Sequence, residues 1–220
     1  MLVKKVILFN DIKKSSVLWK NYKKNMMKKI NVCIKLINRL TKKYNGKLIK
    51  FMGDSFMIEF NSVLKSIMFV IEFNLYLEKK PLVVSKKDNK KIEFRTGISY
   101  GKVDKITYKV QGCNFTDYFG DVVNTASRME SKVSSVNGFA IGIKKITKKD
   151  LQQIVNLLDT YEDEYKYKIR KYVEKKDRYY FGVIPKKRSG KLLNEYNYKK
   201  KNVGKLKGVS STLVIKVMKK

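Results

Sequence analysis

Residues 3–143 alternate between short apolar runs and longer segments with helical spacing, and this order constrains the fold more than any other feature. Runs rich in Val, Ile and Phe predict strands, whereas apolar residues every three or four positions, with lysines between them, predict helices. The order predicts an α+β fold, a sheet covered by helices. The expected elements are strands at Val3–Phe9, Lys47–Phe51, Phe56–Phe60, Ile92–Ser99, Lys102–Thr116 (with a solvated excursion) and Phe139–Ile143, and helices at Trp19–Lys43, Ser62–Leu77 and Val122–Ser131.

The amino-acid composition of the chain changes near residue 150. Its 220 residues suit one domain of ordinary size with an appendage. Asp159–Lys176 mixes charges densely, and Pro185–Lys201 is basic and poor in aliphatic residues, which predicts a helix or hairpin followed by a mobile loop. Leu206–Val217 regains strand character. We therefore divide the chain into a core at 1–149, a divergent charged arm or insertion at 150–203 and a terminal strand at 204–220 that completes the core.

The residue types that are missing exclude several classes of enzyme. The chain has no histidine, which rules out Ser-His-Asp and Cys-His catalysis and histidine-zinc sites. Cys33 and Cys113 are the only cysteines, so we expect two inert buried thiols and no disulfide framework. No run of about 18 apolar residues occurs, so no membrane insertion is expected. We expect a cytoplasmic protein.

The net charge of +32 raises the question of a nucleic-acid partner. The lysines, however, are spread along the whole chain, and arginine, the residue that most often reads base edges, is scarce. We therefore expect no specific nucleic-acid partner, although a basic nucleic-acid-binding protein stays an alternative on charge alone.

Two acids follow strand-like runs, Asp11 after the first and Asp54 in the Gly53-Asp54 turn. They meet only if their strands are adjacent, and the long helix between them gives the chain room to return. Paired carboxylates bind hard cations such as Mg²⁺ or Mn²⁺. Ser15 and Ser16, at the start of a helix that leads into Trp19–Lys43, offer backbone amides to a triphosphate, because helix N-termini attract anions. Taken singly, Asp11 also suits a helix cap, and Gly53-Asp54 an ordinary turn.

The segment Asp117–Ser131 places an acid, a glycine turn, Asn124 and Arg128 in close succession. Asn124 and Arg128 are four residues apart, so a helix presents both on one face. Each also suits an ordinary solvated helix. Together with the two acids and Lys50, they point to two-metal phosphoryl transfer that forms a cyclic nucleotide.

The stretches Leu8–Trp19, Lys50–Phe56 and Asp117–Ser131 resemble the class III nucleotide cyclase catalytic domain, most closely the fungal and protist adenylyl cyclases. The similarity covers residues 3–145 and resumes at Leu206–Val209. It implies a ferredoxin-like antiparallel sheet covered by helices, and a head-to-tail homodimer with two shared sites. It also implies residue roles: Asp11 and Asp54, with the Ile12 carbonyl, bind two Mg²⁺ or Mn²⁺ ions; Lys50 and Asp117 recognise adenine; Asn124 orients the ribose; Arg128 stabilises the transition state; and Lys207 contacts the phosphates.

The expected base follows from hydrogen-bond polarity. A lysine donates to purine N1 and an aspartate accepts from an exocyclic amine, which is the adenine pattern, whereas guanine demands the opposite polarity. We therefore expect an adenylyl cyclase that makes 3′,5′-cyclic AMP and pyrophosphate from ATP for signal transduction. The alternatives are a cyclase specific for GTP or a pyrimidine nucleotide, and an inactive nucleotide-binding pseudo-cyclase.

Overall fold

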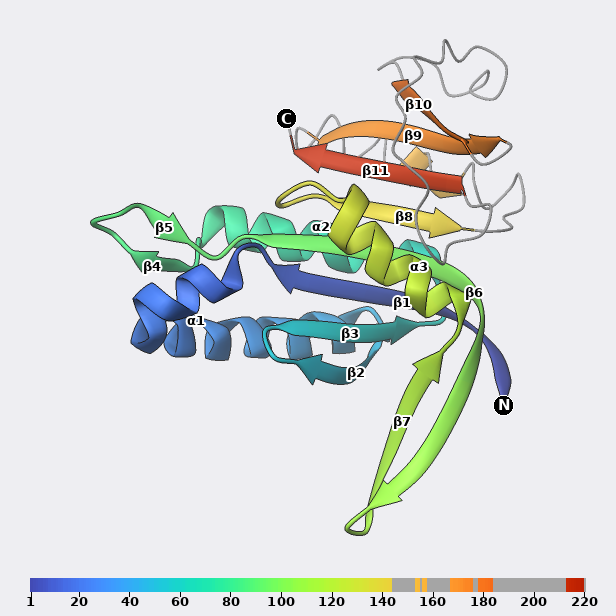
Figure 1. The fold of residues 1–220 in the computed structure, drawn as a ribbon, viewed down its shortest axis with the longest axis horizontal. Coiled ribbons are helices and arrows are strands. Elements are labelled where there is room, and N and C mark those ends of the chain that lie inside the picture. The colour runs from blue at the N-terminus through green and yellow to red at the C-terminus, as the bar shows by residue number, and fades with distance from the viewer. Residues whose placement is uncertain (144–152, 155, 158–166, 176–177, 184–212, 220) are drawn as a thin grey trace.

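A computed structural model describes residues 1–143, 153, 154, 156, 157, 167–175, 178–183 and 213–219. The described strands of the main sheet lie in the order β10-β9-β11-β8-β6-β1-β3-β2, and β7 pairs with β6 outside this path (Figure 1). The elements are β1 (Leu2–Ile12), α1 (Ser15–Lys43), β2 (Lys47–Met52), β3 (Ser55–Phe60), α2 (Val63–Lys79), β4 (Val83–Ser85), β5 (Lys90–Lys91), β6 (Phe94–Val110), β7 (Cys113–Phe119), α3 (Asp121–Arg128), a π-helical turn (Met129–Val133), β8 (Phe139–Ile143), β9 (Tyr167–Lys175), β10 (Arg178–Val183) and β11 (Leu213–Lys219).

The central strands follow the ferredoxin-like order β6-β1-β3-β2, and each neighbouring pair among them is antiparallel. The pairing of β6 with β8 is parallel, and α3 lies on the crossover between them. A parallel pair requires such a crossover because a tight turn cannot return the chain in the same direction. The α+β fold with a ferredoxin-like sheet is therefore confirmed.

Helices cover both faces of this sheet (Figure 1). One core forms between the sheet and helices α1 and α2, and it includes Val6 and Leu8 of β1. The other contains Ile7 of β1 together with Val122 and Ala126 of α3. Successive side chains of a strand point to opposite faces, so β1 is buried on both sides. The same alternation places Asp11, four residues after Ile7, on the face that α3 covers.

Two glycines allow α3 to lie against the sheet. A Cβ atom on Gly97 of β6 would lie 2.1 Å from the Ala126 carbonyl oxygen and 2.2 Å from the Glu130 nitrogen. A Cβ atom on Gly142 of β8 would lie 2.7 Å from Cγ2 of Thr125. Real Cβ atoms do not approach this closely, so glycine at these positions fixes the distance between α3 and the strands.

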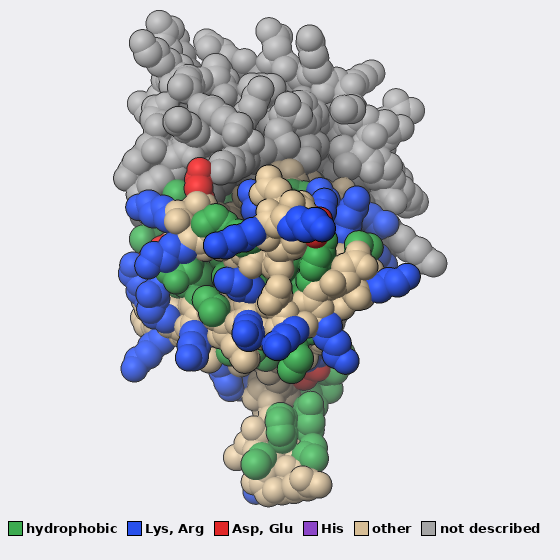
Figure 2. Space-filling view, turned by 90° about the vertical axis from the view of Figure 1, so that its left-hand side faces the viewer, with side chains coloured by type: hydrophobic (Ala, Val, Ile, Leu, Met, Phe, Trp, Pro, Cys, Tyr) green, Lys and Arg blue, Asp and Glu red, His purple; other side chains and the backbone are tan. Residues whose placement is uncertain are grey.

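Strands β6 and β7 continue beyond the sheet as a projecting hairpin (Figure 1). Gln111 and Gly112, both with positive φ, form its turn, where we expected a solvated excursion within one strand. Figure 2 shows hydrophobic side chains on this projection, and the exposed ones include Tyr108, Phe115 and Phe119. Cys113 is exposed at the start of β7, so the expectation of a buried thiol was wrong there, whereas Cys33 is buried.

The other elements match the predictions with small shifts. β8 has the expected bounds, and the predicted helix at 122–131 ends at Arg128 and continues as the π-helical turn. A short β4–β5 hairpin precedes the central strand β6. Beyond residue 150, β9 and β10 form a hairpin, and β11 joins β9 to β8.

Two surface properties bear on possible partners. None of the helices in the described part of the chain has the length and the apolar composition that a membrane span requires. Figure 2 shows lysine and arginine side chains distributed over one face, with hydrophobic and uncharged side chains between them. On that face, the positive charge is dispersed instead of forming one patch.

Candidate active site

The two predicted metal-binding acids lie at neighbouring strand ends. Strands β1 and β3 pair up to Asn10 opposite Phe56, and the turn that contains Asp54 follows directly. Gly53 opens this turn with φ of 67°, a conformation that favours glycine. Burial raises the pKa of Asp11, and the negative charge of Asp54 raises it further, against an opposing hydrogen bond from Arg95. The two carboxylates are therefore close enough to repel each other.

These acids suit a hard divalent cation. Asp54 Oδ2 is buried and has no hydrogen-bond partner among the described residues, which is costly for a carboxylate oxygen. No group of three or more acidic, histidine or cysteine side chains around a possible ion occurs in the described ranges. Proteins nevertheless commonly bind Mg²⁺ through only two carboxylates, because water and substrate phosphates provide the other ligands. The Asp11 and Asp54 carboxylates thus fit the predicted metal-binding role, and the part of the Ile12 carbonyl stays a prediction.

Arg95 is a functional candidate that the sequence analysis missed. Its Nη2 atom lies 3.1 Å from Asp11 Oδ2 and 3.0 Å from Glu130 Oε1, and Nη1 donates to the Ser131 carbonyl at 3.4 Å. Burial raises the pKa of Glu130 to about 7, with Arg95 opposing the rise and Asp11 adding to it. Arg95 stands opposite Asp11 in the β1–β6 ladder. Only the strand register could have identified it.

The predicted base-recognition residues contact each other. Lys50 Nζ lies 2.5 Å from Asp117 Oδ2, although 67 positions separate the two residues in sequence. A bulge in β2 helps to make this contact possible, because the pairing steps from Leu48 to Lys50 while β3 advances by one residue. Without the extra residue, Lys50 would point to the opposite face of the sheet. The bulge therefore aims Lys50 at the face that carries Asp117.

Asn124 and Arg128 lie one helical turn apart on α3, as predicted. Asn124 is exposed and Arg128 is half-buried. Within the described ranges, neither side chain forms a hydrogen bond or an ion pair. Among the described residues, no partner therefore competes with a ligand or another chain for these two side chains. The π-helical turn begins directly after Arg128, and such turns frequently occur at functional sites.

The remaining predicted residues are less constrained. Ser15 and Ser16 are the first two residues of α1, which begins after Lys14 in a left-handed conformation, and no side chain caps the helix. Lys207 lies outside the described residues.

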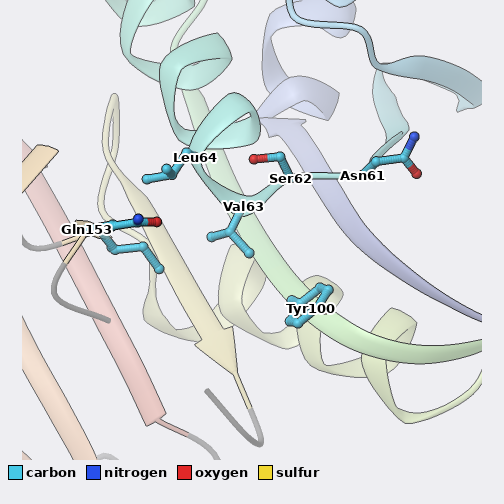
Figure 3. A pocket seen from close by; sticks show the side chains of 7 residues that line it. Asn61, Ser62, Val63, Leu64, Tyr100 and Gln153 are labelled. Atoms are coloured by element: carbon cyan, nitrogen blue, oxygen red, sulfur yellow. The ribbon is translucent and has the colours of Figure 1, made fainter. Parts of the chain in front are cut away.

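A cavity of about 200 Å³ opens between the start of α2, Tyr100 and Gln153, and none of the predicted site residues lines it (Figure 3).

Comparison with known proteins places this geometry in context. The model of the adenylate and guanylate cyclase catalytic domain family matches residues 4–181. The match extends past residue 150, and the division of the chain there stays a prediction. The adenylate cyclase of Mycosarcoma maydis is 27% identical over 177 residues, which are 71% of this chain and 6% of that protein. The chain thus spans a small part of the length of this curated relative.

Two solved structures illustrate the similarity of the fold. The adenylyl cyclase CyaB from P. aeruginosa superposes with a TM-score of 0.64 at 16% identity, over 100% of this chain and 96% of that chain. The guanylate cyclase domain of RhGC from Catenaria anguillulae, in complex with GTP, gives a TM-score of 0.59 at 16% identity, over 99% and 97% of the two chains. Both adenylyl and guanylyl cyclases therefore share this fold, and the fold alone does not select the base.

Proposed function

We propose that this chain, which belongs to the adenylate and guanylate cyclase catalytic domain family, converts ATP to 3′,5′-cyclic AMP and pyrophosphate. The observation that carries the choice of ATP is the contact of 2.5 Å between Lys50 and Asp117. Cyclisation makes a bond from the ribose 3′-oxygen to the α-phosphorus, breaks the bond from that phosphorus to the bridging oxygen of the leaving pyrophosphate, and releases the hydroxyl proton to water. The residues of the candidate site suit each part of this reaction.

Lys50 and Asp117 provide one donor and one acceptor for the base. When adenine enters, Lys50 donates to ring N1 and Asp117 accepts from the exocyclic amine. Guanine presents an acceptor where adenine presents the amine, so Asp117 would face a carbonyl oxygen. A buried polar group left unpaired in this way costs about 1–3 kcal/mol. Adenine is therefore the base that this pair favours.

Asp11, Asp54 and the Ile12 carbonyl would hold two Mg²⁺ or Mn²⁺ ions, which lower the pKa of the attacking hydroxyl and neutralise charge on the leaving pyrophosphate. Burial and mutual repulsion raise the pKa of Asp11, and a bound cation would relieve that repulsion. Arg95, now paired with Asp11, is a further positive charge beside the triphosphate. The amides at Ser15 and Ser16 would bind phosphate oxygens, and Lys207 would contact the phosphates.

Asn124 and Arg128 act at the reacting centre in this proposal. Asn124 orients the ribose, and Arg128 stabilises the charge that grows on the α-phosphoryl oxygens. Arginine suits this role because its guanidinium keeps its charge and donates in a planar fork. Removing such a preorganised donor typically lowers the rate by about 10²–10³-fold.

We infer that the active enzyme is a homodimer with two shared sites. The metal-binding pair and the α3 pair have no described contact that joins them within one chain. The projecting β6–β7 hairpin also carries exposed apolar side chains, with the rings of Tyr108 and Phe115 stacked 5.8 Å apart. Exposed apolar surface of this kind commonly marks a protein interface. A second chain is the partner that would bring Asn124 and Arg128 to the metal-binding acids.

A turnover assay with each of the four ribonucleoside triphosphates and Mn²⁺ tests the proposal. We expect cyclic AMP and pyrophosphate from ATP and little product from the other three. Product from GTP or a pyrimidine nucleotide alone would overturn the base assignment and keep the cyclase reaction. Tight nucleotide binding without any cyclic product would instead favour a pseudo-cyclase.

A further inference from the structure

A chain of contacts extends from the base-recognition pair into the sheet. Asp117 Oδ2 accepts from Lys50, and its Oδ1 accepts from the Tyr118 amide at 2.8 Å. The Tyr118 hydroxyl donates to Glu59 Oε2 on β3. Lys5 Nζ lies 3.5 Å from the same Glu59 oxygen and donates to Asn61 at 2.8 Å. Both carboxylate oxygens of Asp117 thus accept a hydrogen bond. One accepts from the Lys50 side chain, and the other from the backbone amide of Tyr118, whose hydroxyl binds Glu59.

The Tyr118–Glu59 contact is buried. Tyr118 is 2% exposed and Glu59 is 9% exposed. The tyrosine ring packs with Ile7, Met57 and Val122 in the core beneath α3. A buried carboxylate is stable only when it is paired, and here a hydroxyl donor and the Lys5 ammonium group provide the pairing. The contact is therefore a fixed part of the core.

Strand pairing alone does not set the distance between Asp117 and Lys50. Among the described residues, β7 forms ladder hydrogen bonds with β6 only, whereas Lys50 lies on β2 at the far edge beyond β1 and β3. The hydrogen bond from Tyr118 to Glu59 connects β7 directly to β3, the strand that pairs with β2. It therefore fixes the end of β7 that carries Asp117 against the hairpin that carries Lys50.

We propose that Tyr118 and Glu59 are positioning residues that hold Asp117 in register with Lys50 and thereby set the selectivity for adenine among purine nucleoside triphosphates. This inference rests on the proposed function. Neither side chain contacts the base in this assignment. Both act through Asp117, whose carboxylate would otherwise rotate or move with the edge strand.

The Tyr118→Phe variant tests the inference because it removes one hydroxyl and keeps the ring that fills the core. We expect the KM for ATP to rise, and the ratio of kcat/KM for ATP over GTP to fall about five- to tenfold, as expected for one lost hydrogen bond. The kcat at saturating ATP should change less than twofold. Tyr22→Phe is the matched control: it removes a hydroxyl that also donates to a carboxylate, that of Asp88, but lies on α1 outside the proposed site, so its selectivity should equal that of the unaltered chain.

Substitutions of Glu59 separate positioning from folding. Glu59→Gln keeps an oxygen that accepts from Tyr118 and should retain the ATP preference, whereas Glu59→Leu should lose it to the same extent as Tyr118→Phe. Thermal unfolding midpoints identify any variant that is simply unfolded. Unchanged selectivity in folded Tyr118→Phe and Glu59→Leu would overturn the inference.

Equilibrium binding distinguishes this inference from the proposed function. Displacement of a fluorescent ATP analogue by ATP and by GTP measures the same preference without turnover. If the unaltered chain binds ATP selectively but makes no cyclic product, the catalytic proposal fails, and a loss of binding preference in Tyr118→Phe still supports the positioning role. If the unaltered chain binds neither nucleotide, both proposals fail.

Discussion

The proposed base-recognition and metal-binding regions of the candidate site differ in how far the chain completes them. Lys50 and Asp117 neutralise each other across 2.5 Å, and Tyr118 holds the second oxygen of the aspartate. Asp11 and Asp54 instead carry like charges close together, and one oxygen of Asp54 is buried without a described partner. The base-recognition region is therefore preformed, whereas the metal-binding region carries a cost that a cation would remove.

This contrast also explains the position of Arg95. Its guanidinium lies between Asp11 and Glu130 and offsets part of the negative charge that collects there. A single arginine cannot satisfy Asp11, Asp54 and Glu130 together, and the pKa of Glu130 stays raised to about 7. The metal-binding region is thus the one in which activity and stability should respond in opposite directions to the same substitution.

The largest effect is expected from Asp54→Asn. Turnover should fall by at least about 10²–10³-fold because a proposed metal ligand is lost. The free energy of unfolding without divalent cations should stay the same or rise, because a half-buried charge near Asp11 is removed. Turnover and denaturant unfolding measure the two quantities. Asp104→Asn is the control, since Asp104 is exposed on β6. A variant that loses free energy of unfolding as well as turnover would contradict the contrast between the two regions.

Lys50→Ala should have a smaller and more selective effect. The substitution leaves Asp117 without its ion-pair partner, and the preference for ATP over GTP should fall about tenfold, since one hydrogen bond to a charged group is lost. Lys47→Ala, at an exposed position on the same strand, is the control and should leave the preference unchanged. Initial rates with the two nucleotides measure the ratio. Equal losses in the two variants would show that general charge, and not the preformed pair, governs the preference.

The smallest effect concerns the dependence of stability on pH. The pKa of Glu130 is raised in the folded chain to about 7 from 4.5, so the folded state keeps a proton that the unfolded state releases between these values. The free energy of unfolding should therefore fall as pH rises through this window. In Glu130→Gln the free energy of unfolding should fall less steeply with pH. The part of the fall that comes from the raised pKa of Asp11 should remain. Denaturant unfolding measured between about pH 4 and pH 8 checks this expectation. A steeper fall in the variant would contradict the assignment.

Much of the fold could be predicted from the sequence because the pattern of apolar residues is local. The strand at Phe139–Ile143 has the predicted bounds, and the turn at Gly53 places Asp54 beside the end of β1. Arg95 could not be predicted, because its role depends on standing opposite Asp11 in a ladder between distant segments. The Tyr118–Glu59 contact has the same origin.

Two further features depend on three-dimensional pairing. The bulge in β2 that aims Lys50 leaves no local sequence signal, since one extra residue in a strand has an ordinary composition. The exposure of Cys113 follows from the extension of β6 and β7 beyond the sheet, where no described helix covers the end of the hairpin. Residue identity alone predicted a buried thiol.

In the proposed homodimer, each site takes its metal-binding acids from one chain and Arg128 from the other. Mixing purified Asp11→Ala and Arg128→Ala variants tests this arrangement, because each variant alone lacks a required group. A mixed dimer has one site with both substitutions and one with neither. We predict that the mixture regains up to about a quarter of the unaltered activity, since half of randomly formed dimers are mixed and each has one intact site. A mixture as inactive as its two components, with dimers shown to exchange subunits, would contradict the shared site.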